Sequence, residues 1–280
     1  MATARTGELR ALARRIADEL PGSVEEVVLT GSVSRGTADA RSDIEMLVVT
    51  GAQLTLEEAY AASGLPEPQS WGQQGTPTHR VFGYREGVPV EQIWWSRAFA
   101  EEQIAAWSAA EAIANGVSLR TVGLLERWQA RLRQYPEDLA LERIEQAAET
   151  WGGYAPSGVL TLTRDGERVA RVQRMVGDAE RLVRIVFALN RTWEPTLKRL
   201  AQRVEPLPLK PERMAERLDA AFANDDWLGL TELALETVRL APDGPNVVRA
   251  RKWLAEGREI LAGSGGVATT WRGNDLRRSR

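Results

Sequence analysis

The chain contains no cysteine and a single histidine, His79. It therefore has no disulfide, no thiol nucleophile and no cysteine-ligated metal, and one histidine cannot build a histidine-rich metal site. We interpret His79, on an expected strand, as a structural residue or one that supports site residues. The lack of cysteine does not decide the compartment, because reducing and oxidising environments both tolerate it.

Long apolar segments are missing too. No run of 18 apolar residues occurs, which argues against a transmembrane helix, and the charged N-terminal segment lacks the apolar centre of a signal peptide. These features predict a cytoplasmic protein without membrane contact. The net charge of -3 argues against a general nucleic-acid binder, which would usually be basic.

The first hundred residues mix helical and strand patterns. An apolar stripe predicts a helix over 5–20, which Pro21-Gly22 ends, and a second, short helix is expected over 55–62. Short apolar or alternating runs predict strands over residues 27–29, 43–49, 79–85 and 88–95. This part of the chain is therefore expected to form a small mixed sheet with helices.

Beyond residue 97 the chain is rich in Ala, Leu, Glu and Arg at helical spacing. The pattern predicts helices over residues 97–113, 119–134, 137–150, 165–190, 211–223, 226–240 and 245–262. We therefore predict an α+β protein with three parts: a domain with a mixed sheet over 1–110, a helical bundle over 111–262 and a mobile tail over 263–280.

A Gly-Ser turn followed by two alternating acids is the most specific motif in the chain. Gly31-Ser32 precedes Asp43 and Glu45, which would share one face of a strand while the residues between them face the core. Neighbouring carboxylates repel, and a divalent cation relieves the repulsion. The turn can bring backbone N–H groups close to phosphates. The alternative reading is a strand end with two solvated acids after an ordinary turn.

Gly31-Ser32, the spacer 33–42 and Asp43-Ile-Glu45 resemble the motif of the nucleotidyltransferase superfamily named after DNA polymerase beta. Within that superfamily, the run Ser-Asp-Ile-Glu-Met and Arg35 look most like kanamycin (aminoglycoside) nucleotidyltransferase. The resemblance is limited to residues 31–46. It implies a nucleotidyltransferase fold for the first domain, ATP or another nucleoside triphosphate as co-substrate, and a two-ion Mg²⁺ site.

The resemblance also implies roles for the acids. Asp43 and Glu45 would hold the metal ions, and Glu91, in Val88-Pro-Val-Glu, would be a third ligand or the base. For Glu91, a solvated acid on an edge strand is the alternative interpretation.

The same resemblance implies that Gly31, Ser32 and Arg35 bind the phosphates. Ser32 offers a hydroxyl and a backbone N–H, and the planar guanidinium of Arg35 suits a phosphate. For Arg35, the alternative is a surface ion pair with Asp39 or Asp43.

The helical part contributes a further pair, Glu194 and Lys198. Kanamycin nucleotidyltransferases have a Glu that acts as general base and, four residues later, a Lys that binds the triphosphate. Lys198 is one of only three lysines, whereas the remaining basic residues are Arg, and a compact ammonium is a good point charge for phosphate. A Pro follows Glu194, so the local helix differs, and an i,i+4 surface pair is the alternative reading.

Together these features predict an enzyme that transfers AMP from ATP to a hydroxyl of a small-molecule acceptor, with aminoglycosides as candidates. The related antibiotic enzymes place residues of two subunits in one site, which makes a homodimer a candidate assembly. One alternative is a nucleotidyltransferase that modifies a protein or RNA partner, as in toxin–antitoxin systems, which are usually shorter chains. The other is a catalytically dead nucleotide-binding module, against which the intact acid pair argues.

Overall fold

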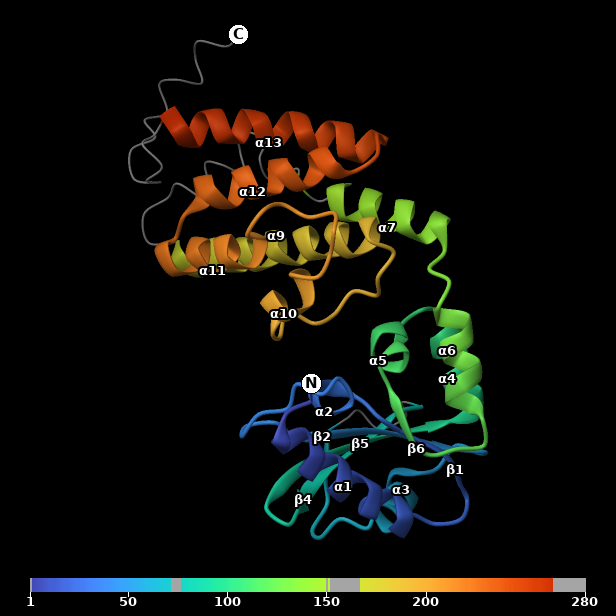
Figure 1. Ribbon diagram of the computed structural model, residues 1–280. Coiled ribbons are helices and arrows are strands. Elements are labelled where there is room, and N and C mark those ends of the chain that lie inside the picture. The colour runs from blue at the N-terminus through green and yellow to red at the C-terminus, as the bar shows by residue number, and fades with distance from the viewer. Residues whose placement is uncertain (1, 72–76, 150, 152–166, 264–280) are drawn as a thin grey trace. The chain divides into compact units, whose positions relative to one another are not determined.

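The computed structural model describes residues 2–71, 77–149, 151 and 167–263. The chain divides into two compact units, of which the first ends at Gln134 and the second begins at Tyr135 (Figure 1). The first unit contains a mixed sheet with helices and the second is helical, which confirms the predicted α+β class. The predicted mobile tail over 263–280 lies outside the described residues, except for Gly263.

The first unit is built around one six-stranded sheet with the strand order β3-β4-β5-β2-β1-β6. Strands β2 and β5 are parallel, and the other neighbours are antiparallel. In chain order its elements are α1 (Ala4–Glu19), β1 (Val24–Leu29), α2 (Gly31–Ser34), β2 (Ile44–Thr50), α3 (Leu56–Ala62), β3 (Gln69–Trp71), β4 (His79–Arg85), β5 (Val88–Ser96), α4 (Arg97–Ala105), α5 (Ala110–Ala114), β6 (Val117–Arg120) and α6 (Leu124–Leu132).

The two faces of the sheet differ because side chains alternate along each strand. One face is apolar and packs against α1 and α3, with Ile44, Met46 and Val48 of β2 in its core (Figure 1). On the opposite face, α4 packs over β2 and β5, and α6 packs over β1. On that second face, Asp43, Glu45 and Glu91 are only half-buried.

The sequence pattern missed three short elements of this unit, α2, β3 and β6. Each has four or fewer residues, too short to show a repeat of polar and apolar positions. The domain boundary expected after residue 110 remains a prediction. The segment that follows it nevertheless packs within the first unit, because β6 pairs with β1 and α6 contacts α5 and β1.

A buried carboxylate on β1 holds the start of α6, the last helix of this unit, in place. Glu26 of β1 is fully buried and accepts hydrogen bonds from the backbone N–H groups of Leu124 (3.0 Å) and Val122 (3.2 Å) and from the Thr121 hydroxyl (2.9 Å). Leu124 is the first residue of α6, so the carboxylate binds N–H groups that no helical carbonyl can reach.

We expect Glu26→Ala to lower the free energy of unfolding by about 3 kcal/mol, because it leaves buried N–H groups unpaired and opens a cavity. Glu26→Gln keeps an acceptor oxygen and should lose about half as much. Urea unfolding followed by circular dichroism would measure both. An Ala variant as stable as the wild type would contradict the assignment of Glu26 as a structural anchor.

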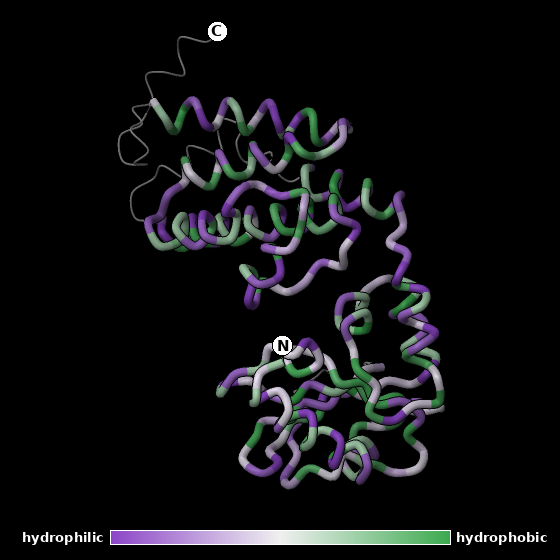
Figure 2. The backbone as a smooth tube through the Cα atoms, viewed as in Figure 1, coloured by the Kyte–Doolittle hydropathy of each residue, from purple (hydrophilic) through white to green (hydrophobic). Residues whose placement is uncertain are grey.

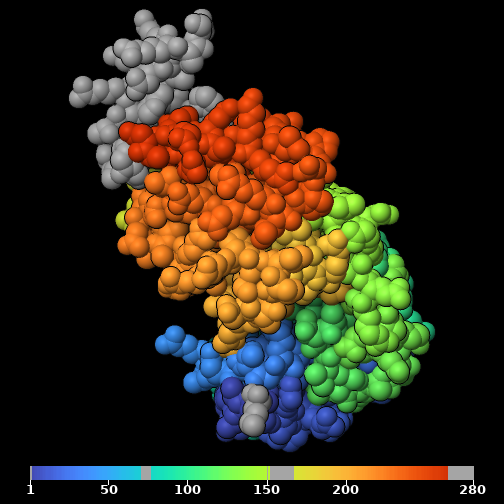
Figure 3. Space-filling model, turned by 45° about the horizontal axis from the view of Figure 1, so that its top comes forward, coloured from blue at the N-terminus to red at the C-terminus, as the bar shows by residue number. Residues whose placement is uncertain are grey.

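The second unit contains six described helices around one apolar core. They are α7 (Glu137–Glu149), α9 (Arg168–Leu189), α10 (Leu200–Val204), α11 (Met214–Asn224), α12 (Trp227–Leu240) and α13 (Pro245–Gly263). Polar and apolar segments alternate along α13 (Figure 2), as expected of a helix with one face on the core, and α13 forms part of the visible surface of this unit (Figure 3). Among the described helices, none has the length and apolarity required to cross a membrane.

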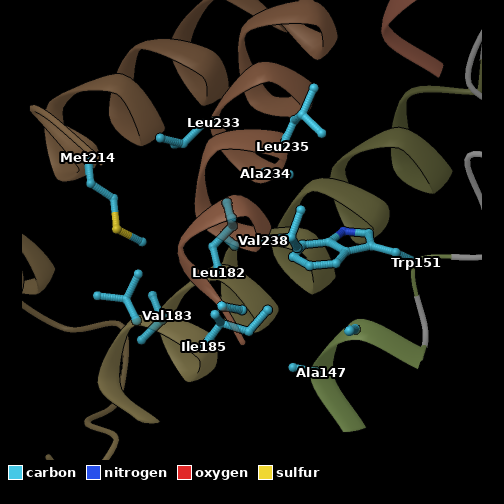
Figure 4. Close-up of a cluster of buried hydrophobic side chains, with 14 of the residues drawn as sticks. Ala147, Trp151, Leu182, Val183, Ile185, Met214, Leu233, Ala234, Leu235 and Val238 are labelled. Atoms are coloured by element: carbon cyan, nitrogen blue, oxygen red, sulfur yellow. The ribbon is translucent and has the colours of Figure 1, made fainter. Parts of the chain in front are cut away.

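The core of this unit lies where α7, α9, α11 and α12 meet (Figure 4). Its labelled side chains are Ala147, Trp151, Leu182, Val183, Ile185, Met214, Leu233, Ala234, Leu235 and Val238. Asp178 of α9 is also fully buried. It accepts hydrogen bonds from the Trp151 indole (2.9 Å) and from Arg181 (2.6 Å), so the buried charge is paired.

Candidate active site

The Gly-Ser turn lies between β1 and the short helix α2 and is held from two sides. The Thr30 N–H donates to the Glu45 carbonyl (2.9 Å), which fixes the turn against β2. The Arg10 guanidinium of α1 donates to the carbonyls of Val33 (3.1 Å) and Ser34 (2.6 Å) at the end of α2. These bonds make the turn a fixed part of the fold.

Gly31 has a left-handed backbone, with φ of 67°, and lies against the second acid of the motif. A Cβ atom at this position would be 1.6 Å from Oε2 of Glu45, so the carboxylate occupies the space that a side chain would need. Both facts require glycine. The structure therefore brings together Gly31 and Glu45, which belong to different parts of the motif.

Ser32 follows in α2 and is half-buried. The first hydrogen bond within this helix runs from the Ser34 N–H to the Thr30 carbonyl, so the helix itself does not use the preceding N–H groups. Within the described parts of the chain, the Ser32 hydroxyl has no hydrogen-bond partner. Ser32 thus directly follows the glycine that lies against Glu45, with a hydroxyl and an N–H to offer.

Asp43 directly precedes β2 and is half-buried. The turn before it is closed by Ser42, whose hydroxyl accepts from the Asp39 N–H (2.9 Å). The Asp43 carboxylate makes no hydrogen bond or ion pair with any residue that the structure describes. Asp43 and Glu45 are both half-buried and flank the buried Ile44, which agrees with the predicted alternation.

Glu91 of β5 is the register partner of Glu45 on the parallel strand β2. Partners in register point to the same face of a sheet, with neighbouring strands about 5 Å apart. Glu91 is not on an edge strand, because β5 lies between β4 and β2. Its carboxylate pairs with Arg80 of β4 at 3.2 Å.

The backbone thus gathers three acids on one face, but the Glu91 carboxylate is paired with Arg80 while the Asp43 carboxylate has no partner among the described residues. In the described parts of the chain, no three Asp, Glu or His side chains converge on a point that could hold a metal ion. Side-chain rotation alone can bring acids on neighbouring strands together. The donor set suits a hard cation such as Mg²⁺, which prefers carboxylate oxygens, and the space at Gly31 keeps the Glu45 carboxylate beside the turn.

Arg35, at the end of α2, pairs with Glu111 of α5 at 3.4 Å. Both side chains are largely buried. This partner could not be predicted from the sequence, because 76 positions separate the two residues. The Glu111 carboxylate limits the rotamers of Arg35 and so holds the guanidinium near the turn.

If Arg35 binds phosphate, Arg35→Ala should raise the KM for the nucleoside triphosphate about tenfold or more, because it removes a charged hydrogen bond. Glu111→Gln should raise the same KM severalfold and leave kcat nearly unchanged, since it only loosens Arg35. Steady-state kinetics would measure both, with the exposed Arg41→Ala as the control for loss of a nearby positive charge. Equal kinetics in Arg35→Ala and Arg41→Ala would contradict the role.

Glu194 and Lys198 lie in the second unit, in the segment between α9 and α10. Residues 192–196 form no helix, so the two residues are not an i,i+4 pair on one helical face. Glu194 accepts two hydrogen bonds from Arg184 of α9, at 3.0 and 3.4 Å, while the Lys198 side chain is exposed. Their roles as general base and phosphate ligand remain predictions.

An aromatic cluster beside Glu194 was not indicated by the sequence. The rings of Tyr135 and Trp193 have centroids 4.5 Å apart, and the Arg143 guanidinium lies within 6 Å of both ring centres. Arg143 also donates to the Tyr135 hydroxyl (3.1 Å). Burial raises the pKa of Tyr135, and the Arg143 charge opposes that shift.

Comparison with protein families matched residues 9–77 to the nucleotidyltransferase domain family. Residues 101–200 match a family described as a domain of unknown function (DUF4037). No curated protein matches the chain. The first match contains the Gly-Ser turn and both acids of the motif, and it supports the nucleotidyltransferase superfamily. Kanamycin nucleotidyltransferase as the particular relative stays a prediction.

Among solved structures, a nucleotidyltransferase-like protein from Exiguobacterium sibiricum is 14% identical, with 93% of this chain and 76% of that chain covered and a TM-score of 0.29. Cid1 in complex with the UTP analog UMPNPP is 16% identical, with 53% of this chain and 38% of that chain covered and a TM-score of 0.21. Likenesses this low carry no argument about substrate or mechanism.

Proposed function

We propose that the chain is a Mg²⁺-dependent nucleotidyltransferase that transfers AMP from ATP to a hydroxyl of a small-molecule acceptor. The observation that supports the proposal is the close approach of Gly31 to Glu45, which brings the Gly-Ser turn and the second acid of the motif together. The family match over residues 9–77 supports the same class, whose members generally use a nucleoside triphosphate and a divalent metal.

In this reaction, the acceptor oxygen forms a bond to the α-phosphorus while the bond from that phosphorus to the bridging oxygen breaks. Pyrophosphate leaves with the electron pair, and the hydroxyl proton passes to a carboxylate. Mg²⁺, when bound, would neutralise phosphate charge. Asp43 and Glu45 would hold the metal, and Glu91 would be a third ligand or accept the proton.

The phosphates would be bound by Gly31, Ser32 and Arg35. Ser32 has a free hydroxyl among the described residues, and Arg35 is oriented by Glu111. Within the second unit, Lys198 is exposed and would add a positive charge for the triphosphate, and Glu194 is the candidate general base. For Glu194 to act as base, its pairing with Arg184 would first have to break.

The test is pyrophosphate release from each of the four ribonucleoside triphosphates with Mg²⁺, against a pooled panel of acceptors that includes aminoglycosides. Asp43→Asn is the negative control. Release that requires both an acceptor and Asp43 is the expected result. Tight ATP binding without release, across all acceptors, would instead indicate a module that only binds nucleotide.

A further inference from the structure

Glu91, one of the three acids of the candidate site, already has a positively charged partner. Nη1 of Arg80 on β4 lies 3.2 Å from Oε1 of Glu91 on β5. The carboxylate is the more buried partner, with 23% of the Glu91 side chain exposed and 55% of the Arg80 side chain. Arg80 therefore supplies a positive charge to a carboxylate that is partly removed from water.

The register of the two strands places Arg80 beside Glu91. The partner of Arg80 on β5 is Ile93, two residues after Glu91, so Arg80 and Glu91 lie on the same face of the sheet. Diagonal neighbours of this kind are about 7–8 Å apart, a distance that a long side chain can span. The contact thus follows from the backbone pairing of β4 with β5.

The other two acids lie on the opposite side of Glu91. Strand β5 has β4 on one side and β2 on the other, and Glu45 of β2 is the register partner of Glu91. Within the described ranges, the acids do not converge on a point that could hold a metal ion. To join Glu45 around a cation, the Glu91 carboxylate has to turn toward β2, which takes it away from Arg80 on β4.

We infer that Arg80 is an internal counter-ion that competes with the divalent cation for Glu91 and so lowers the affinity of the site for its metal. One carboxylate cannot turn toward both neighbouring strands at once, and two cations that share it repel each other. Arg80 is a positioning residue in this account, because it acts through Glu91. The inference rests on the proposed nucleotidyl transfer and concerns regulation of that same site.

The experiment measures metal binding directly, with Mn²⁺ as the probe, because carboxylate oxygens suit Mn²⁺ as well as Mg²⁺. Free Mn²⁺ is counted by electron paramagnetic resonance with the full chain, without nucleotide and with α,β-methylene-ATP, which cannot release pyrophosphate. Arg80→Ala should lower the Kd for Mn²⁺ about three- to fivefold, as expected for loss of a partly exposed ion pair. Arg80→Lys keeps the charge and should stay close to the wild type.

The matched control is Arg15→Ala, which breaks the pair of Arg15 with Glu86 in the same unit and should leave the Kd unchanged. The Arg15 side chain is 53% exposed, close to the 55% of Arg80. A gain in affinity also cannot result from a damaged fold, which would weaken metal binding.

The decisive comparison is made in the Glu91→Gln background, where Arg80→Ala should no longer change the Kd for Mn²⁺. Equal affinities in the wild type and Arg80→Ala, or the same gain with and without Glu91, would overturn the inference and leave nucleotidyl transfer standing. If the wild type bound no more Mn²⁺ than Asp43→Asn, with and without nucleotide, both the inference and the proposed metal-dependent function would be wrong.

Discussion

Asp43→Asn is expected to lower pyrophosphate release at least about a thousandfold while the protein stays folded. The substitution keeps the size of the side chain but removes the charge that a divalent cation and its phosphates require. Among the described residues, the Asp43 carboxylate has no hydrogen-bond or ion-pair partner, so its loss breaks no structural contact. The free energy of unfolding should change by less than about 0.5 kcal/mol.

The matched control for this prediction is Asp18→Asn, which removes one exposed acid from α1 in the same unit. Its turnover should equal that of the wild type. Rates are compared at saturating ATP and Mg²⁺, with circular dichroism as the test of folding. If the folded Asp43→Asn variant retained wild-type turnover, Asp43 would not be a metal ligand.

Much of the fold could be predicted because its elements are long and strongly patterned. The apolar stripe over 5–20 became α1 (Ala4–Glu19), and the alternation of 88–95 became β5 (Val88–Ser96). In both cases the side that faces the core is decided by residues close in the sequence. The short elements α2 and β6 escaped prediction, because their place depends on strands and helices distant in the chain.

In the candidate site, too, features set by neighbouring residues could be predicted and features set by distant residues could not. Asp43 and Glu45 could be placed on one face from spacing alone, because a strand has a period of two. The pairings of Arg35 with Glu111 and of Glu91 with Arg80 could not, since each joins different secondary-structure elements. The predicted relation of Glu194 to Lys198 needed a helix, and the chain there is irregular. Sequence therefore indicated which acids share a face, but not which cations pair with them.

The second large effect is expected for Gly31→Ala, which should lower turnover about a hundredfold or more. The added methyl group would overlap the Glu45 carboxylate, which must then swing away from the Gly-Ser turn. Because Glu45 is a flexible side chain that can move, the cost in folding free energy should be only about 1–2 kcal/mol, mostly from the left-handed backbone.

Gly64→Ala is the control that separates the effect of backbone strain on turnover from the effect of displacing the Glu45 carboxylate. Gly64 also has a positive φ, 65°, in the same unit, but a Cβ atom there would meet nothing within 4 Å. It should lose similar stability and keep its turnover. In the Gly31→Ala background, Glu45→Asp shortens the acid and should restore part of the rate. Equal turnover in the two alanine variants would show that the contact between Gly31 and Glu45 has no part in catalysis, because the backbone strain is matched and only the displaced carboxylate differs.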